Sequence, residues 1–162
     1  MDSIKTKINK IGIIGKGFVG SAVAHGFSAA CGYDAEIRIY DKDSKKSINT
    51  LDDTVNNSDF IFISVPTPAD KNGKIDLSII NSVLKDIDAV NKNETNIVLV
   101  RSTVVPGTTQ SLQDKFPSLR IVFNPEFLTE RSAMFDFINQ TRIILGGDKE
   151  HTAMVSSLYR DR

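Results

Sequence analysis

The feature that most constrains this chain is a glycine-rich turn between an apolar run and a helical pattern. Residues Gly15–Gly20 read G-x-G-x-x-G and directly follow the apolar run Ile8–Ile14. In this motif the first glycine permits a tight turn, the second lets the backbone approach a pyrophosphate, and the third lets the helix pack close to the strand. Lys16 is followed by glycine rather than Ser or Thr, which excludes a Walker A loop. The spacing predicts a dinucleotide-binding strand–turn–helix unit, with a plain tight turn as the alternative.

An acidic residue follows the second predicted strand. The run Ile37–Tyr40 ends at Asp41, 21 positions after Gly20, where a ribose-binding carboxylate is expected. Such a carboxylate accepts hydrogen bonds from the ribose hydroxyls and repels a 2′-phosphate, so the sequence favours NAD over NADP. Three lysines close by weaken that repulsion: Lys42, Lys45 and Lys46.

Short β-branched runs alternate with helix-like stretches along the chain. The predicted strands are Ile8–Ile14, Ile37–Tyr40, Phe60–Val65, Ile97–Val100, Leu119–Phe123 and Arg142–Leu145. The predicted helices are Val19–Ala30, Ser44–Leu51, Leu77–Asn91, Thr108–Lys115 and Lys149–Leu158. Most of the runs are continuously apolar, as is typical of strands buried on both faces of a parallel sheet. The order predicts an α/β fold: a Rossmann-type, doubly wound, mostly parallel sheet forming a single domain over residues 1–162.

Composition excludes several classes of function. Lys plus Arg and Asp plus Glu number 20 each, so a net charge of zero gives no electrostatic basis for binding nucleic acid. No apolar run is long enough to span a membrane, and Met1–Lys7 does not begin a signal peptide. The lone Cys31 and the separated His25 and His151 indicate no disulfide and no metal site. We therefore expect a cytoplasmic protein.

Three further segments combine polar residues with proline at predicted strand ends. They are Ser64–Pro68, Arg101–Thr109 and Asn124–Glu130. Ligands of open α/β sheets bind at the carboxyl ends of the strands, so these segments are expected to converge with the glycine turn. Simpler alternatives exist for each: the hydroxyls of Thr67, Ser102 and Thr103 can cap helices. Glu126 and Glu130 can share one helical face or stand as two solvated carboxylates.

With these residues in place, the chain resembles the N-terminal NAD-binding domain of the UDP-glucose/GDP-mannose dehydrogenase family. The resemblance rests on Gly15–Gly20, Asp41, Val65–Pro68, Ser102–Val104 and Asn124–Glu130, and it continues to Ala133, Asp136 and Arg142–Ile144. It implies an oxidoreductase that converts the C6 alcohol of a UDP-glucose-like nucleotide sugar to a carboxylate while reducing two NAD.

The resemblance also implies roles for individual residues. The pyrophosphate is expected on Gly15, Lys16, Gly17, Phe18, Val19 and Gly20, and the ribose on Asp41 and Lys46. The nicotinamide side is expected along Val65, Pro66, Thr67, Ser102, Thr103 and Val104, with Glu130 as a further cofactor contact. The implied catalytic residues are Glu126, as acid or base, and Thr103; Glu126, Phe127 and Leu128 are the implied substrate contacts.

The chain departs from the family pattern in places. Arg101 stands where Lys is usual, Arg131 where Gly is common, and Gln140 where Pro is frequent. The family's middle and C-terminal domains, with a catalytic Cys and Lys, have no counterpart in these 162 residues. We therefore expect incomplete catalysis by the chain alone, with self-association or a complementary chain as its partner.

Two alternatives remain. The first is a non-catalytic NAD-binding module that serves as a sensor or partner subunit. The second is a small hydroxy-acid dehydrogenase, which the segment Asn124–Leu128 disfavours.

Overall fold

The computed structural model describes residues 8–160, and these fold around one parallel sheet. The strands are β1 (Lys10–Ile14), β2 (Glu36–Tyr40), β3 (Phe60–Ile63), β4 (Ile97–Val100) and β5 (Ile121–Phe123). They lie in the order β2-β1-β3-β4-β5, and every pairing is parallel. The chain continues from β1 to β2 on one side and then to β3 on the other side, so the strand order reverses at β1. Ligands of such sheets bind at this switch point, which here lies between the carboxyl ends of β1 and β3. The predicted doubly wound α/β fold is confirmed.

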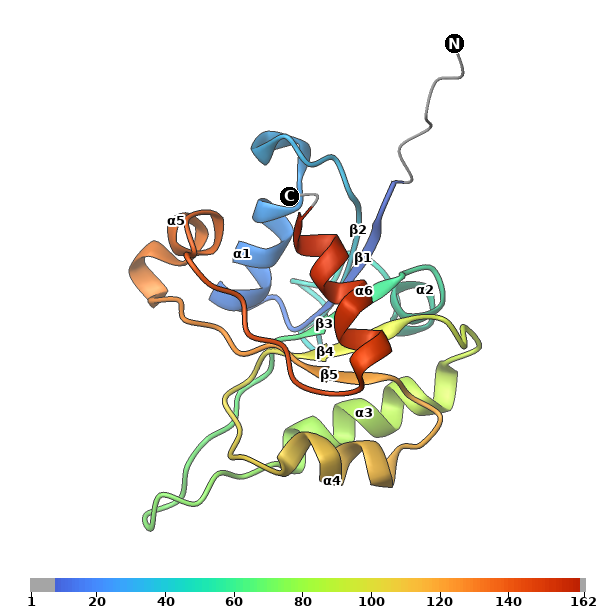
Figure 1. Ribbon diagram of the computed structural model, residues 1–162, viewed down its shortest axis with the longest axis vertical. Helices are drawn as coiled ribbons and strands as arrows, with labels where there is room; N and C mark the ends of the chain where they lie inside the picture. The colour runs from blue at the N-terminus through green and yellow to red at the C-terminus, as the bar shows by residue number, and fades with distance from the viewer. Residues whose placement is uncertain (1–7, 161–162) are drawn as a thin grey trace.

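Helices cover both faces of the sheet (Figure 1). One face packs against α1 (Phe18–Gly26), α5 (Ala133–Ile138) and α6 (Lys149–Arg160). The other packs against α2 (Leu51–Asn56), α3 (Ser78–Val90) and α4 (Thr108–Lys115). Two 3-10 turns, η1 (Ala29–Cys31) and η2 (Glu130–Ser132), complete the described elements.

The continuous apolar character of the strands follows from this layering. In β3, Phe60 and Phe62 face the layer of α1, α5 and α6, whereas Ile61 and Ile63 face the layer of α2, α3 and α4. Because successive side chains point to opposite faces, a strand covered on both sides needs apolar residues at every position. All four side chains are buried, which explains why this run shows no polar alternation.

The prediction of a sixth strand at Arg142–Leu145 is wrong. This segment is irregular, and it is followed by one antiparallel bridge between Phe123 and Gly146. The outer edge of β5 already has other partners: the Ile121 N–H donates to Gln113 Oε1 at 2.9 Å, and Gly146 exchanges both backbone hydrogen bonds with Phe123. Few backbone groups of this short strand remain for a parallel neighbour.

The predicted helix at Ser44–Leu51 is also wrong, because local side-chain bonds favour a turn. Asp43 accepts the Lys45 N–H on its carboxylate and the Lys46 N–H on its carbonyl. The helix begins later, at Leu51, where the Thr50 hydroxyl accepts the Asp53 N–H at 3.1 Å. Short polar side chains that bond the backbone in this way compete with helix formation.

Other boundaries differ less. The first helix ends at Gly26 rather than Ala30 and is followed by η1, and β3 ends at Ile63, two residues before the predicted end. The short helix α5 is not predicted from the sequence. Its apolar residues Met134, Phe135 and Ile138 are exposed, so the apolar positions do not follow the spacing of a helix with one buried face. Within residues 8–160, no helix is long and apolar enough to cross a membrane. The expectation about Met1–Lys7 lies outside the described residues.

Candidate functional site

The segments predicted to form a site lie together at the carboxyl edge of the sheet. The registers place Ile14 beside both Tyr40 and Ile63, and Val100 beside both Ile63 and Phe123. The glycine turn, Asp41, Ser64–Pro68, Arg101–Gly107 and Asn124–Glu130 therefore all leave the sheet on one side. The tertiary fold confirms the expected convergence of these loops.

Two of the three motif glycines are required by packing. Gly15 has φ +95°, and a Cβ there would lie 2.4 Å from the Ser64 carbonyl oxygen. A Cβ on Gly20 would lie 2.0 Å from the Gly15 carbonyl oxygen. Both distances are impossible for carbon, so these residues set how closely α1 and β3 approach the turn.

Gly17 differs from the other two. It is exposed, and a Cβ there would meet nothing within 4 Å. It is also the N-cap of α1, and no side chain caps that helix. The first N–H groups of a helix lack intrahelical acceptors, so this open, uncapped turn fits an oxygen-rich anionic group such as a pyrophosphate. Phe18 and Val19 begin the helix, exposed and half-buried respectively.

Asp41 is tied to the glycine turn. Its Oδ2 accepts the Lys16 N–H at 2.6 Å, and its Oδ1 accepts the Asp43 N–H at 2.8 Å. A carboxylate oxygen can accept more than one hydrogen bond, so these bonds orient Asp41 and leave it able to bind hydroxyls. Lys46 lies exposed in the turn that begins at Asp43.

The loops after β3 and β4 are bonded to each other. The Ser102 hydroxyl donates to the Val65 carbonyl at 2.6 Å, and the Thr67 hydroxyl donates to the Thr103 carbonyl at 3.0 Å. These two hydroxyls therefore cross-link the loops. Thr103 and Pro66 remain exposed.

Val104 takes a different direction from its neighbours. It packs against the layer of α2, α3 and α4 and lines a groove of about 1160 Å³ beside α4, β5 and the start of α6. No residue of the glycine turn lines that groove. This hollow is therefore bordered by the end of the β4 loop but lies apart from the glycine turn.

Glu126 and Glu130 do not share a helical face. Residues 124–129 are irregular, and Glu130 begins η2 with an exposed side chain. Glu126 is half-buried, and this burial raises the pKa of its carboxyl, against the opposing effects of Arg101 and the Leu128 N–H. The two acids thus have separate environments, and only Glu126 is desolvated.

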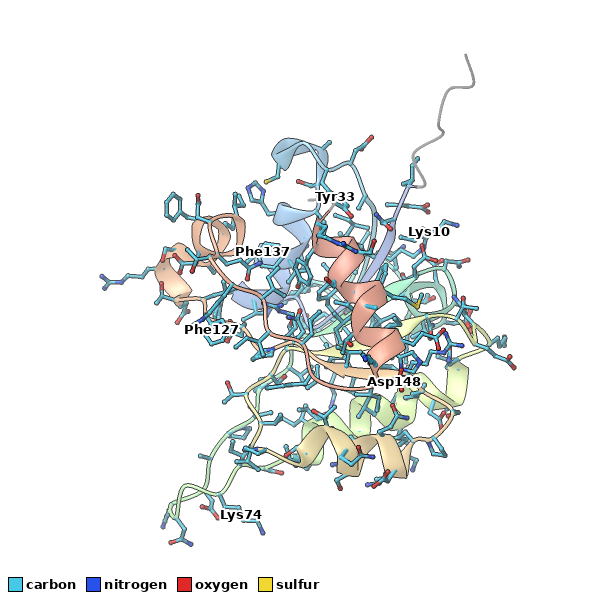
Figure 2. The ribbon with its side chains drawn as sticks, viewed as in Figure 1. Lys10, Tyr33, Lys74, Phe127, Phe137 and Asp148 are labelled. Atoms are coloured by element: carbon cyan, nitrogen blue, oxygen red, sulfur yellow. The ribbon has the colours of Figure 1, made fainter. Side chains whose placement is uncertain are left out.

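The residues beside Glu126 point in different directions. Leu128 packs against the core under α1, α5 and α6. Phe127 is exposed, and the Arg142 guanidinium lies 4.7 Å from its ring centroid. Figure 2 shows Phe127 near the η2 end of the molecule and Phe137 between α5 and α6 in this view.

A buried polar cluster at this edge was missed as a unit. Arg101 is 1% exposed, and its Nη1 donates to Asn124 Oδ1 at 2.7 Å and to the Tyr159 hydroxyl at 3.2 Å. The signal for it in the sequence is an arginine directly after a fully apolar strand, at a position where the family usually has lysine. Within residues 8–160, no group of three potential metal ligands gathers.

An open parallel sheet, an uncapped glycine-lined helix start and an acid after β2 define a dinucleotide-binding domain. The model of the UDP-glucose/GDP-mannose dehydrogenase family, NAD binding domain, matches residues 47–162. The chain belongs to this family, and its cofactor is NAD.

Relatives agree with this assignment. The UDP-glucose 6-dehydrogenase of Campylobacter jejuni is 42% identical over 91 residues, covering 56% of this chain and 23% of the relative. That of Rickettsia conorii is 32% identical over 138 residues, covering 78% and 32%. The ternary complex of GDP-mannose dehydrogenase from Pseudomonas aeruginosa superposes with a TM-score of 0.77 at 28% identity, covering 93% and 44%. The chain thus spans less than half the length of these relatives.

The glycine turn generates the first prediction. Gly17→Val is expected to abolish NAD binding with little change in melting temperature, because the new side chain fills open space where the pyrophosphate must approach. Gly20→Ala is the matched control, and it is expected to lower the melting temperature sharply because its Cβ meets backbone. Calorimetry and thermal unfolding give both readouts. A collapse of stability in Gly17→Val would contradict the assignment.

The second prediction concerns cofactor choice. The wild-type chain is expected to bind NAD more tightly than NADP, and Asp41→Ala to weaken NAD binding about tenfold or more, since a hydrogen bond to a charged group contributes about 1.5–3 kcal/mol. Asp41→Asn retains an acceptor but not the charge, so it separates repulsion from loop positioning. Equal affinities of the wild type for NAD and NADP by calorimetry would refute this role.

The third prediction follows from the raised pKa of Glu126. The folded state holds this proton more tightly than the unfolded chain, so wild-type stability falls as pH rises from the ordinary value of 4.5 through the raised pKa. Glu126→Gln removes the titration. Urea unfolding at about pH 4 and about pH 7.5 should show the variant gaining stability relative to the wild type at the higher pH. A relative loss would mean that attraction to Arg101 outweighs desolvation.

Proposed function

We propose that this chain is the NAD-binding domain of a nucleotide-sugar 6-dehydrogenase, which oxidises the C6 alcohol of UDP-glucose or a close relative to a carboxylate. The observation that supports it most is the half-buried Glu126, a desolvated acid at the same sheet edge as the glycine turn. A carboxyl whose pKa is raised by burial holds and exchanges a proton more readily than a fully solvated one.

Within this proposal the site residues divide into two groups. The cofactor is held by Gly15, Lys16, Gly17, Phe18, Val19, Gly20, Asp41, Lys46, Val65, Pro66, Thr67, Ser102, Thr103, Val104 and Glu130. Of these, Val104 acts through the backbone of its loop, because its side chain packs on the opposite layer. The substrate side consists of Glu126, Thr103, Phe127 and Leu128. NAD supplies the hydride acceptor when bound.

The loop geometry supports this division. The bonds Ser102–Val65 and Thr67–Thr103 hold the β3 and β4 loops at a fixed separation. On the substrate side, Asp136 accepts the Thr129 N–H at 2.9 Å and the hydroxyls of Thr129 and Ser132 at 2.8 and 2.9 Å. These bonds fix the far end of the Glu126 loop, so the acid is presented by a braced segment.

We also propose that residues 1–162 form one domain. We further propose that the second of the two oxidations, from the aldehyde to the carboxylate, needs a thiol supplied from outside this domain. Aldehyde oxidation by hydride transfer requires a tetrahedral adduct first, and in this family a Cys thiolate forms it. Cys31 ends η1, beyond the C-terminal end of α1, whereas Gly17 is the N-cap of that helix. Cys31 therefore lies at the opposite end of α1 from the glycine turn.

The fourth prediction is that the chain alone binds NAD without forming UDP-glucuronate. NADH absorbance at saturating NAD and UDP-glucose should stay near background, and Cys31→Ser should not change it. Robust turnover that disappears in Cys31→Ser would refute the position assigned to the thiol.

A binding experiment separates the dehydrogenase domain from a non-catalytic NAD-binding module. UDP-glucose added to the NAD-loaded chain is expected to shift the amide resonances of Phe127 and Leu128, with Asn93, in the loop before the amino end of β4, as an unaffected reference. If NAD shifts the glycine turn but UDP-glucose shifts nothing, the module is the better description.

A further inference from the structure

Arg101 is the largest fully buried side chain among the described residues. It directly follows β4, and its backbone N–H donates to the Ile63 carbonyl at 3.0 Å. Its guanidinium lies 5.5 Å from the Phe137 ring centroid, so α5 covers one side. A permanently charged group in such surroundings is costly unless it is paired and hydrogen-bonded.

No described carboxylate lies within 4.0 Å of this guanidinium. The partners of Nη1 are neutral, namely Asn124 and Tyr159, and no described group accepts from the buried Nε and Nη2. The positive charge of Arg101 is therefore not compensated by a contact ion pair with any described carboxylate.

Hydrogen bonds fix the position of the Arg101 guanidinium. Asn124 Oδ1 accepts from both Arg101 and the Tyr159 hydroxyl, the latter at 2.6 Å. Asn124 Nδ2 donates to the Ile144 carbonyl at 3.1 Å, which fixes the orientation of the amide. Three segments, β5's exit loop, residues near Ile144 and the last turn of α6, therefore combine to place one cation.

Glu126 is the acid on which this cation acts. It lies two residues beyond Asn124, and its Oε2 is also buried without a described partner. Burial raises the pKa of Glu126, and Arg101 is the main influence that opposes the rise, followed by the Leu128 N–H. Among the described residues, no other charged side chain contributes to this pKa shift.

We propose that Arg101, clamped by Asn124 and Tyr159, is a positioning residue that sets the charge state of Glu126. A contact ion pair would compensate the charge of the carboxylate and occupy at least one of its oxygens. A cation held by neutral partners, rather than in contact with the acid, favours ionisation and leaves the carboxylate free to take a proton. The proposal rests on the proposed function only in giving Glu126 an acid–base role.

The test is a carbon-detected NMR titration of Glu126 in the whole chain without ligand, with Glu126→Gln identifying the resonance. Arg101→Met and Arg101→Gln are expected to raise the Glu126 midpoint by about one pH unit, and Arg101→Lys to change it by less than about half as much. Asp136 is the internal control: hydrogen bonds from Thr129 and Ser132 lower its pKa, and this low value should persist in folded variants.

An unchanged Glu126 midpoint in either neutral variant, with the Asp136 midpoint intact, would overturn the proposal. If neither neutral variant folds, the proposal is tested instead by following the Arg101 Nε resonance of the wild type through the same pH titration. In the wild type it is expected to shift with the Glu126 midpoint, and in Glu126→Gln it should not shift in that range. A flat wild-type resonance would also overturn the proposal. None of these readouts uses NAD or a sugar nucleotide, so they are independent of whether the proposed function holds.

Discussion

The close approach of α1 to β1 is the constraint on which the rest of this structure depends. It exists because two glycines face each other across the turn, with the Gly15 carbonyl where a Cβ of Gly20 would be. This contact brings the start of α1 to the reversal point between β1 and β3. The same position is where an uncapped helix start can bind phosphate oxygens. One packing requirement thus produces both the layer arrangement and the cofactor site.

The carboxyl edge has two parts with different electrostatic character. On the cofactor side, the glycine turn is open at the exposed Gly17, and Asp41 is held by the Lys16 N–H. On the Glu126 side, a buried cation and a half-buried acid lie in a poorly solvated region. Binding NAD needs accessible donors, whereas acid–base chemistry needs a shifted pKa, which only burial and fixed charges provide. The loops after β3 and β4 lie between the two parts, cross-linked by the bond from Ser102 to Val65 and the bond from Thr67 to Thr103.

Sequence reasoning succeeded where local and tertiary preferences agree. The strand Ile97–Val100 and the helix Thr108–Lys115 have their predicted bounds. A continuously apolar run buried on both faces and a helix that begins directly after a glycine leave few other positions for the element ends. It failed at Ser44–Leu51, where Asp43 and Thr50 form local bonds that shift the helix start. It failed again at Arg142–Leu145, where the β5 edge is bonded to Gln113 and Gly146. A β-branched run predicts a strand only if an edge is free to pair with it.

The spacing of Gly15, Gly17, Gly20 and Asp41 alone determined the class of cofactor, because those residues act through backbone geometry and charge at fixed distances along one strand–turn–helix–strand unit. The order of apolar runs likewise determined a doubly wound α/β sheet. The tertiary structure alone decided that Glu126 is desolvated while Glu130 is not. It also decided that Arg101 is buried among Asn124, Phe137 and Tyr159. Burial is a property of what packs around a residue, and here those neighbours come from segments 23 to 58 positions away.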